Sequence, residues 1–142
     1  MLRMSTYSGV SSTPGMQGIQ VITRDDATGI ALRYVEDETL KTGVDLVLLD
    51  DYTIERGVGW MFFYNSRKYL ETGDYRFSVG GNAPLIVDRS NGSPHVTGTA
   101  YDPEDYLLAY EELGPDRFHS ADLAEFMRKL ARKPWHARRS RL

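Results

Sequence analysis

Histidine is the side chain that most often carries general acid–base catalysis, and this chain has three, at positions 95, 119 and 136. None of their spacings matches a zinc motif such as HExxH, in which two histidines share one face of a helix. The surrounding residues place His95 at the edge of a hairpin, His119 at a helix start and His136 in a basic tail. We therefore interpret the three histidines as separate, solvated surface residues.

Motifs for nucleophilic catalysis and for phosphate binding are missing. The sequence has no GxSxG elbow for a serine nucleophile, and no GxxxxGK[ST] or GxGxxG loop for a phosphate. The segment FSVGGN, residues 77–82, resembles an oxyanion loop only through its glycines, which also permit tight backbone turns. The absence of cysteine excludes a thiol nucleophile, a cysteine-rich zinc site and a disulfide framework.

Carboxylates are the remaining candidates for chemistry. A metal site or a glycosidase pair needs acidic groups that converge from different elements of the fold. The candidates are Glu36, Asp37, Glu38, Asp50, Asp51, Glu71 and Asp74. We interpret them as solvated acidic faces, and we predict that the protein is not an enzyme and has no catalytic residue, metal site or cofactor.

The uneven distribution of charge bears on the choice of partner. The formal net charge is -3, and residues 128–142 contain seven of the seventeen basic residues and none of the twenty acidic ones. Such a basic tail is able to hold nucleic acid, with Trp135 stacking on a base. However, the strongly acidic remainder of the chain would repel phosphate, so nucleic-acid binding is not expected.

Composition is typical of a soluble globular protein, with 142 residues of which 41% are hydrophobic and 26% charged. No apolar run approaches the roughly 18 residues that span a bilayer. Residues 1–20 are rich in Ser, Thr and Gly and lack the apolar centre of a signal peptide. We expect a flexible leader at 1–20, no membrane contact and a cytoplasmic location.

The periodicity of the apolar residues predicts the elements in the first half of the chain. A helix is expected to begin at a cap, Asp25 or Asp26, and to end near Gly43. Residues 44–50 are apolar on both faces, which predicts a central strand that 52–55 continues after a break. Residues 60–65 predict a second strand, antiparallel to the first. The apolar stripe of the helix is Ala27, Ile30, Ala31, Tyr34 and Val35.

The second half of the chain predicts a polar loop, a hairpin and two helices. Asn91-Gly92 lies between the strand-like runs 84–89 and 95–99 and is typical of a two-residue hairpin turn, while Pro94 favours an edge strand. Helices are expected at 102–113 and 120–133. The predicted fold is α+β: an antiparallel sheet of about four strands with an N-terminal helix, a helix after the sheet and an extra C-terminal helix.

A set of short motifs, in order over residues 25–113, resembles the YrhB-like family, also called immunity protein 35. The motifs are Gly59-Trp60 with Phe62, Glu71-Thr72-Gly73-Asp74, Gly81-Asn82-Ala83-Pro84, Asn91-Gly92, Gly98-Thr99 and Tyr110-Glu111. The resemblance implies a YrhB-like immunity domain at 21–113. Residues 114–142, a C-terminal helix and basic tail, depart from the family pattern.

The resemblance also implies a function. Family members are expected to be non-enzymatic α+β proteins, and the implied role is an immunity protein, or antitoxin, that binds and blocks a cognate toxin in a bacterial polymorphic toxin system. A second reading of the same family is a small chaperone-like protein that protects other proteins from aggregation. Both readings predict a protein partner.

Two groups of residues are singled out on this basis. The structural group is Gly59, Trp60, Phe62, Gly81, Asn82, Pro84, Asn91 and Gly92; we expect Trp60 to be buried, Asn82 to bond its own backbone and Pro84 to start a strand. The partner-binding group is Tyr69, Leu70, Glu71, Asp74 and Tyr75. The large side chains would anchor the partner, and the two acids would steer a basic toxin.

Overall fold

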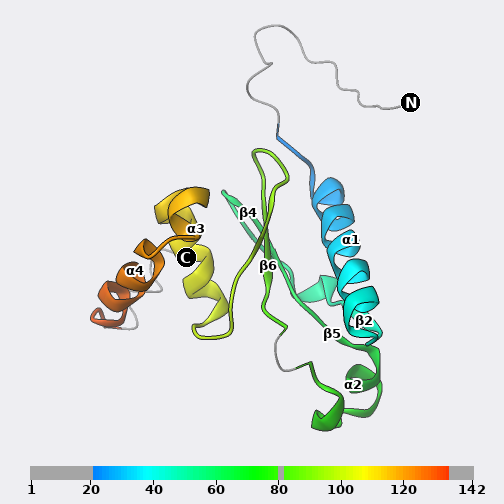
Figure 1. The fold of residues 1–142 in the computed structure, drawn as a ribbon. Coiled ribbons are helices and arrows are strands. Elements are labelled where there is room, and N and C mark those ends of the chain that lie inside the picture. Colours follow the sequence, from blue (N-terminus) through cyan, green and yellow to red (C-terminus); the bar gives the residue numbers. More distant parts are fainter. Residues whose placement is uncertain (1–20, 80–81, 135–142) are drawn as a thin grey trace, which may run out of the picture.

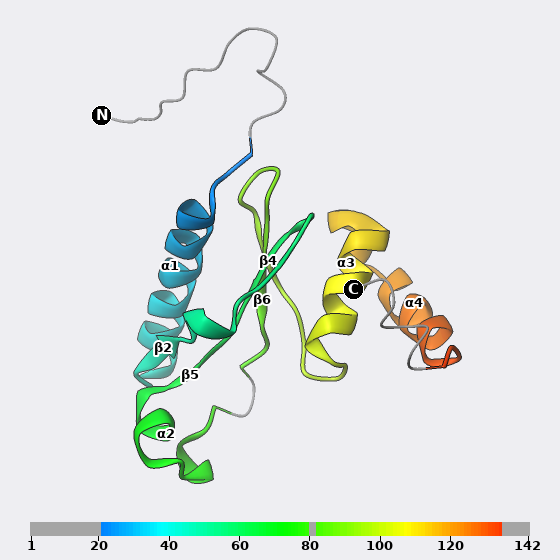
Figure 2. The same ribbon diagram turned by 180° about the vertical axis from the view of Figure 1, so that it is seen from behind.

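The computed structural model describes residues 21–79 and 82–134. A central antiparallel sheet lies between helix α1 (Arg24–Thr42) on one side and helices α3 (Pro103–Phe118) and α4 (Asp122–Ala131) on the other (Figures 1 and 2). The predicted α+β class and the predicted positions of the helices are confirmed. In the part of the chain that the structure describes, no helix is long and apolar enough to cross a membrane.

The strands form two antiparallel sheets. The larger sheet has the order β3 (Ile54–Arg56), β4 (Gly59–Phe62), β6 (Leu85–Asp88) and β7 (Pro94–Val96), and the smaller one pairs β2 (Leu46–Leu48) with β5 (Tyr64–Ser66). The 3-10 helix η3 (Asp50–Tyr52) separates β2 from β3. The predicted second strand at 60–65 is therefore split into β4 and β5, and the two pieces pair with different strands.

The prediction that residues 44–50 form a central strand is wrong. Within the described residues, β2 has β5 as its one neighbour and so lies at an edge. Its apolar character has another cause: Leu46 packs against Val35 of α1 and Tyr64 of β5 in a small buried cluster. A strand that is covered by a helix on one face needs apolar residues there even when its edge is open.

Helix α1 covers one face of the larger sheet. It begins at Thr23, whose side chain accepts from the backbone N–H of Asp26 at 3.1 Å while the Asp26 side chain accepts from Thr23 N–H. The cap is therefore Thr23 and not either predicted aspartate, although Asp26 completes the capping box. Gly43 ends the helix in the left-handed conformation, as predicted. The core under α1 contains Ala27, Ala31, Trp60, Phe62, Leu85 and Val87.

Helices α3 and α4 share a second core with the opposite face of the sheet. Met61 and Ile86 of the sheet contact α3, and Met127 and Leu130 bring α4 onto the same cluster. The regular helix breaks at Gly114, where φ is 81°, which agrees with the predicted end near residue 113; a further helical segment then runs to Phe118 and is included in α3. The extra C-terminal helix is thus packed against the domain through apolar contacts.

The β6–β7 hairpin joins the predicted runs, and Pro94 lies in the edge strand β7 as expected. Its turn differs from the predicted two-residue type. The backbone N–H of Asp88 donates to the Ser93 carbonyl at 2.9 Å, so that four residues separate this pair. Arg89 instead donates its N–H to the Val58 carbonyl at 2.9 Å, which draws the chain towards the β3–β4 turn before it reverses.

The structural residues of the sequence prediction have clear roles where they are described. Trp60 is 1% exposed, as predicted. Asn82 does not bond its own backbone as predicted; its Nδ2 donates to the Tyr64 carbonyl and ties the 82–84 segment to β5. Pro84 precedes β6, and its carbonyl accepts two hydrogen bonds from Thr97. Gly81 lies outside the described residues.

Candidate partner-binding site

An apolar groove opens where the β2–β5 sheet meets α2 (Arg67–Thr72). The groove has a volume of about 500 Å³ and is lined by Leu49, Tyr52, Ile54, Phe63, Asn65, Tyr69 and Leu70. The β2–β5 sheet lies on the α1 side of the molecule, away from α3, and α2 lies beyond the ends of both helices (Figures 1 and 2). Two of the lining residues, Ile54 and Phe63, also pack against the core cluster that α3 shares.

Large side chains are unusually accessible around this groove. The exposed fraction is 69% for Tyr52, 45% for Leu70 and 82% for Tyr75. The ring centroid of Tyr75 lies 5.8 Å from that of Tyr69, so these residues form one continuous surface with the groove. Contiguous exposed apolar surface of this kind marks interaction sites more often than scattered exposed residues do. Three of the predicted partner-binding residues, Tyr69, Leu70 and Tyr75, meet at this surface.

Local capping fixes the helix that carries Tyr69 and Leu70. Ser66 is the N-cap of α2, and its hydroxyl accepts from the Tyr69 N–H at 3.0 Å while donating to the Phe77 carbonyl. Gly73 ends α2 with φ of 70° and donates to the Tyr69 carbonyl at 2.7 Å. Because Ser66 bonds both to α2 and to Phe77, it holds the groove-lining helix against the segment that follows it.

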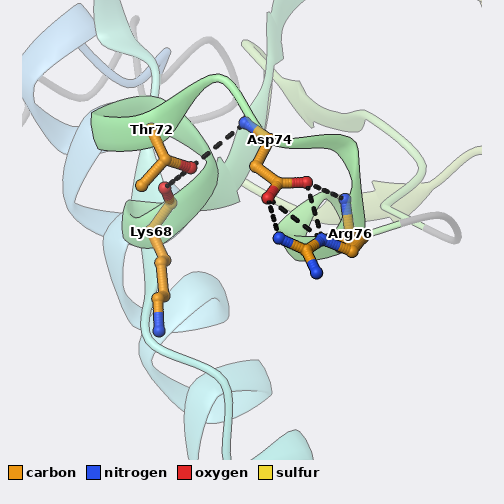
Figure 3. A network of polar contacts seen from close by, with 4 residues as sticks. All are labelled: Lys68, Thr72, Asp74 and Arg76. Atoms are coloured by element: carbon orange, nitrogen blue, oxygen red, sulfur yellow. Dashed lines mark hydrogen bonds and ion pairs between the residues drawn. The ribbon is translucent and has the colours of Figure 1, made fainter.

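The carboxylate of Asp74 is occupied by its own loop. Figure 3 shows it beside Arg76, with contacts to the backbone N–H of Arg76 at 3.0 Å and to its guanidinium at 2.6 Å. Hydrogen bonds from Arg76 lower the pKa of Asp74. The Asp74 N–H donates to Thr72 Oγ1, which in turn donates to the Lys68 carbonyl (Figure 3). Asp74 thus caps the 3-10 helix η4 (Tyr75–Phe77), and its charge is balanced by Arg76.

Glu71 and Asp51 are the acidic side chains near the groove that keep their charge available. Both are exposed, and among the described residues neither has a hydrogen bond or an ion pair, although the charge of Glu71 interacts with that of Arg67 on the same helix. Asp50, beside Asp51, is paired with Arg24 at 2.6 Å. Negative charge near the groove therefore comes from Glu71, which the sequence placed in the partner-binding group, and from Asp51. The sequence alone indicated only that Asp51 is a solvated acidic residue.

The two histidines that the structure describes lie in contact, so their interpretation as separate surface residues is wrong. His95 Nδ1 lies 2.8 Å from His119 Nε2, and His95 Nε2 lies 2.8 Å from Ser93 Oγ. The His95 ring also packs on Tyr110, at 4.9 Å between centroids. Burial, and then the neighbouring His119, lower the pKa of His95. No sequence signal joins these residues, because 24 positions separate the two histidines.

A buried carboxylate lies next to this pair. Asp88 accepts hydrogen bonds from the Tyr110 hydroxyl and from both the N–H and the hydroxyl of Ser90. Burial alone would raise the pKa of Asp88, but these hydrogen bonds lower it below its ordinary value. Burial and the contact with Asp88 raise the pKa of the Tyr110 hydroxyl. These hydrogen bonds join β6 to the turn that follows it and to the middle of α3.

The Ser93–His95–His119 contacts have the connectivity of a nucleophile, a base and an orienting group. A hollow of about 300 Å³ lies beside them, but its lining includes His119 and neither Ser93 nor His95. A substrate in this hollow would thus not contact the hydroxyl or the base. Within residues 21–79 and 82–134, no group of three or more His, Cys, Asp or Glu side chains is placed to hold a metal ion.

Comparison with known proteins assigns the family. The family model described as immunity protein 35 matches residues 25–111. The chain belongs to the immunity protein 35 family. It is also 37% identical over 91 residues to the uncharacterized protein YrhB of Escherichia coli strain K12, an alignment that covers 64% of this chain and 90% of that relative. No solved structure matches the chain.

The region matched by immunity protein 35 contains both sheets, α1 and α2 and ends within α3. The groove at α2 and the free edge of β2 therefore belong to the family domain. Helix α4, with Met127 and Leu130 in its interface, lies outside the match, as the sequence resemblance predicted. The resemblance to the YrhB-like family is confirmed.

Proposed function

We propose that this protein is an immunity protein that neutralises a bacterial toxin by binding to it and covering its functional surface, without catalysis. Membership of the immunity protein 35 family supports this role. It would act in the cytoplasm, where a toxin made by the same cell or received from a neighbour would have to be blocked.

The observation that carries the proposal is the open apolar groove with its exposed anchors. Leu70 and Tyr75 protrude from α2 and the following loop, and Tyr52 faces the same region from η3. Interfaces draw most of their binding energy from a few large side chains that lose water completely in the complex. Tyr75 lies on a segment that Asp74 caps, and Leu70 lies on a helix that Ser66 caps. Both residues are suited to anchor a partner, because their backbone is already ordered and loses little conformational entropy on binding.

Charge would guide the encounter. Glu71 and Asp51 place exposed negative charge near the anchors, which favours a partner with a basic surface. In the complex, Glu71→Lys should slow association and weaken its dependence on salt, whereas Asp37→Lys, at an exposed position of α1 that does not line the groove, should change both less. If the association rates of the two variants depended equally on salt, electrostatic steering by Glu71 would be contradicted.

The decisive experiment is growth rescue. If a toxin gene lies beside the gene for this protein, its toxin domain is expressed in a test bacterium, with the full-length protein supplied from a second promoter. We expect rescue by the parent, a loss of rescue with Leu70→Asp and unchanged rescue with Leu40→Asp. Leu40 is a matched control, because it is 79% exposed on α1 and does not line the groove. Thermal unfolding of both variants checks that the fold is intact.

The outcomes separate three readings. Rescue by Leu70→Asp equal to that by the parent would show that the groove is not the binding surface. Turnover of the toxin or of a product, abolished by His95→Ala, would contradict inhibition without catalysis. Protection of an unrelated enzyme from heat aggregation, with no rescue of growth, would favour the chaperone-like role over immunity.

A further inference from the structure

Strand β2 turns part of its backbone away from the rest of the sheet. In an antiparallel pair, every second residue directs its N–H and C=O towards the neighbouring strand. The Asp45 carbonyl accepts from the β5 side at 2.9 Å, and the Leu49 N–H donates to that side at 2.8 Å. Since Asp45, Val47 and Leu49 face β5, the backbone groups of Leu46 and Leu48 face outward.

Among the residues that the structure describes, only one of these outward-facing backbone groups forms a hydrogen bond. The Leu46 N–H donates to Thr39 Oγ1 of α1 at 3.1 Å. Across the described ranges, no residue bonds to the Leu46 carbonyl or to the N–H and carbonyl of Leu48. A strand edge with free donors and acceptors is a template on which an extended segment adds as the next strand.

The free edge faces a groove whose far wall is α1. This groove has a volume of about 480 Å³, and Leu32, Arg33, Val35 and Glu36 form the α1 side of it. Leu32 is 51% exposed, which is unusual for a leucine that borders a hollow. A strand added to β2 would direct every second side chain towards this wall, where Leu32 favours an apolar residue.

Charged side chains on the α1 side of the groove indicate which residues a docked segment would carry. Arg33 and Glu36 are exposed, and neither has an ion pair elsewhere in the described residues. Beside β2, by contrast, Arg67 and Asp45 already pair with each other at 2.8 Å. A complementary segment therefore carries an apolar residue opposite Leu32, an acidic residue near Arg33 and a basic residue near Glu36.

We propose that an extended segment of a protein partner docks on the free edge of β2 as an additional strand, with an apolar side chain on Leu32 and charges that match Arg33 and Glu36. A second copy of this chain fits the edge less well. If two β2 strands paired about a two-fold axis, each copy would bring its own α1 wall into the groove of the other. A single segment has no such helix and occupies the space between α1 and β2.

This inference rests on the proposed function, because it names how the protein partner would be held. The probe is a phage-displayed library of random ten-residue peptides selected on the full-length protein. Selected peptides should contain alternating apolar residues and should bind Leu32→Asp at least tenfold more weakly than the parent. The matched variant Leu40→Asp, eight positions along α1 and outside the groove, should bind them within about twofold of the parent.

Two further measurements report strand addition itself. Hydrogen exchange of the Leu48 amide should slow when the peptide binds, while the Val47 amide, which already faces β5, should change little. N-methylation of the peptide at successive positions should abolish binding with a period of two residues, because only every second peptide N–H faces β2. A structural effect of Leu32→Asp alone would produce neither result.

Two outcomes would overturn the inference. A library that yields no binder contradicts a peptide-binding edge. So does a set of binders whose affinity falls with Leu70→Asp and not with Leu32→Asp, since these occupy the other groove. Both results are independent of growth rescue, which tests toxin neutralisation. Growth rescue without peptide binding at β2 would support the immunity role and contradict only this docking mode.

Discussion

Gly59, the first residue of β4, offers a sharp test of how the sheet is packed. Its φ is 152°, a conformation that side-chain-bearing residues rarely adopt. A Cβ atom at this position would lie 2.1 Å from the carbonyl oxygen of Val87 on β6, whereas ordinary contact begins at 3.4 Å. Alanine therefore does not fit at position 59 unless β4 and β6 move apart.

The magnitude follows from these two effects. The backbone conformation costs a non-glycine residue about 1–3 kcal/mol. Separating the strands at this point breaks ladder hydrogen bonds, each contributing about 1 kcal/mol. We expect Gly59→Ala to lower the free energy of unfolding by about 3–4 kcal/mol, which corresponds to roughly 10–15 °C in Tm for a chain of this length.

The assay is unfolding by urea and by heat, followed by far-UV circular dichroism. Gly57→Ala is the matched control, because Gly57 lies in the same β3–β4 turn and a Cβ there has no atom within 4 Å. Its stability should stay within about 0.5 kcal/mol of the parent. The reasoning about Gly59 is refuted if the two alanine variants unfold at the same urea concentration with the same slope.

Three further predictions concern the core, the histidine pair and the tail. Trp60→Ala removes a side chain that is 1% exposed and should cost about 3–5 kcal/mol; a melting curve like that of the parent would contradict this. Acidification from about pH 7 to 5 should reduce stability, because the folded state lowers the pKa of His95 from 6.5 and so takes up fewer protons than the unfolded chain. The reduction, measured by urea unfolding at each pH, should be smaller in His119→Ala, which removes one cause of the shift. A chain that ends at Lys133 should keep the cooperative transition of the parent, because residues 134–142 have no apolar period and several like charges; loss of that transition would show that the tail is part of the fold.

Local sequence determined the helices and most strand positions. The spacing of Ala27, Ala31 and Val35 is set by the helical repeat, and all three are buried beneath α1 as that repeat requires. Trp60 and Phe62 alternate with Met61 and lie on the opposite face, as the pleat of a strand demands. These features follow from backbone geometry over a few residues, so a single sequence is sufficient to predict them.

Tertiary structure decided which strands meet and which side chains gather. Nothing in the apolar run 44–50 distinguishes a central strand from one that α1 covers at an open edge, because both bury the same residues. The contact between His95 and His119 depends on where the kinked α3 ends relative to β7. Likewise, Asp74 is neutralised by Arg76 only because Gly73 turns the chain and a short helix follows.

The candidate site shows the same division. The sequence indicated that Tyr69, Leu70 and Tyr75 lie between strands, but it contained no sign that Tyr52 and Phe63 would line the same groove. That groove lies where α2 meets the β2–β5 sheet, on the side of the molecule away from α3 (Figures 1 and 2), and this placement of helices around distant strands is a property of the assembled fold. The free edge of β2 is likewise a property of the tertiary structure. The register between β2 and β5 sets which backbone groups of β2 face outward.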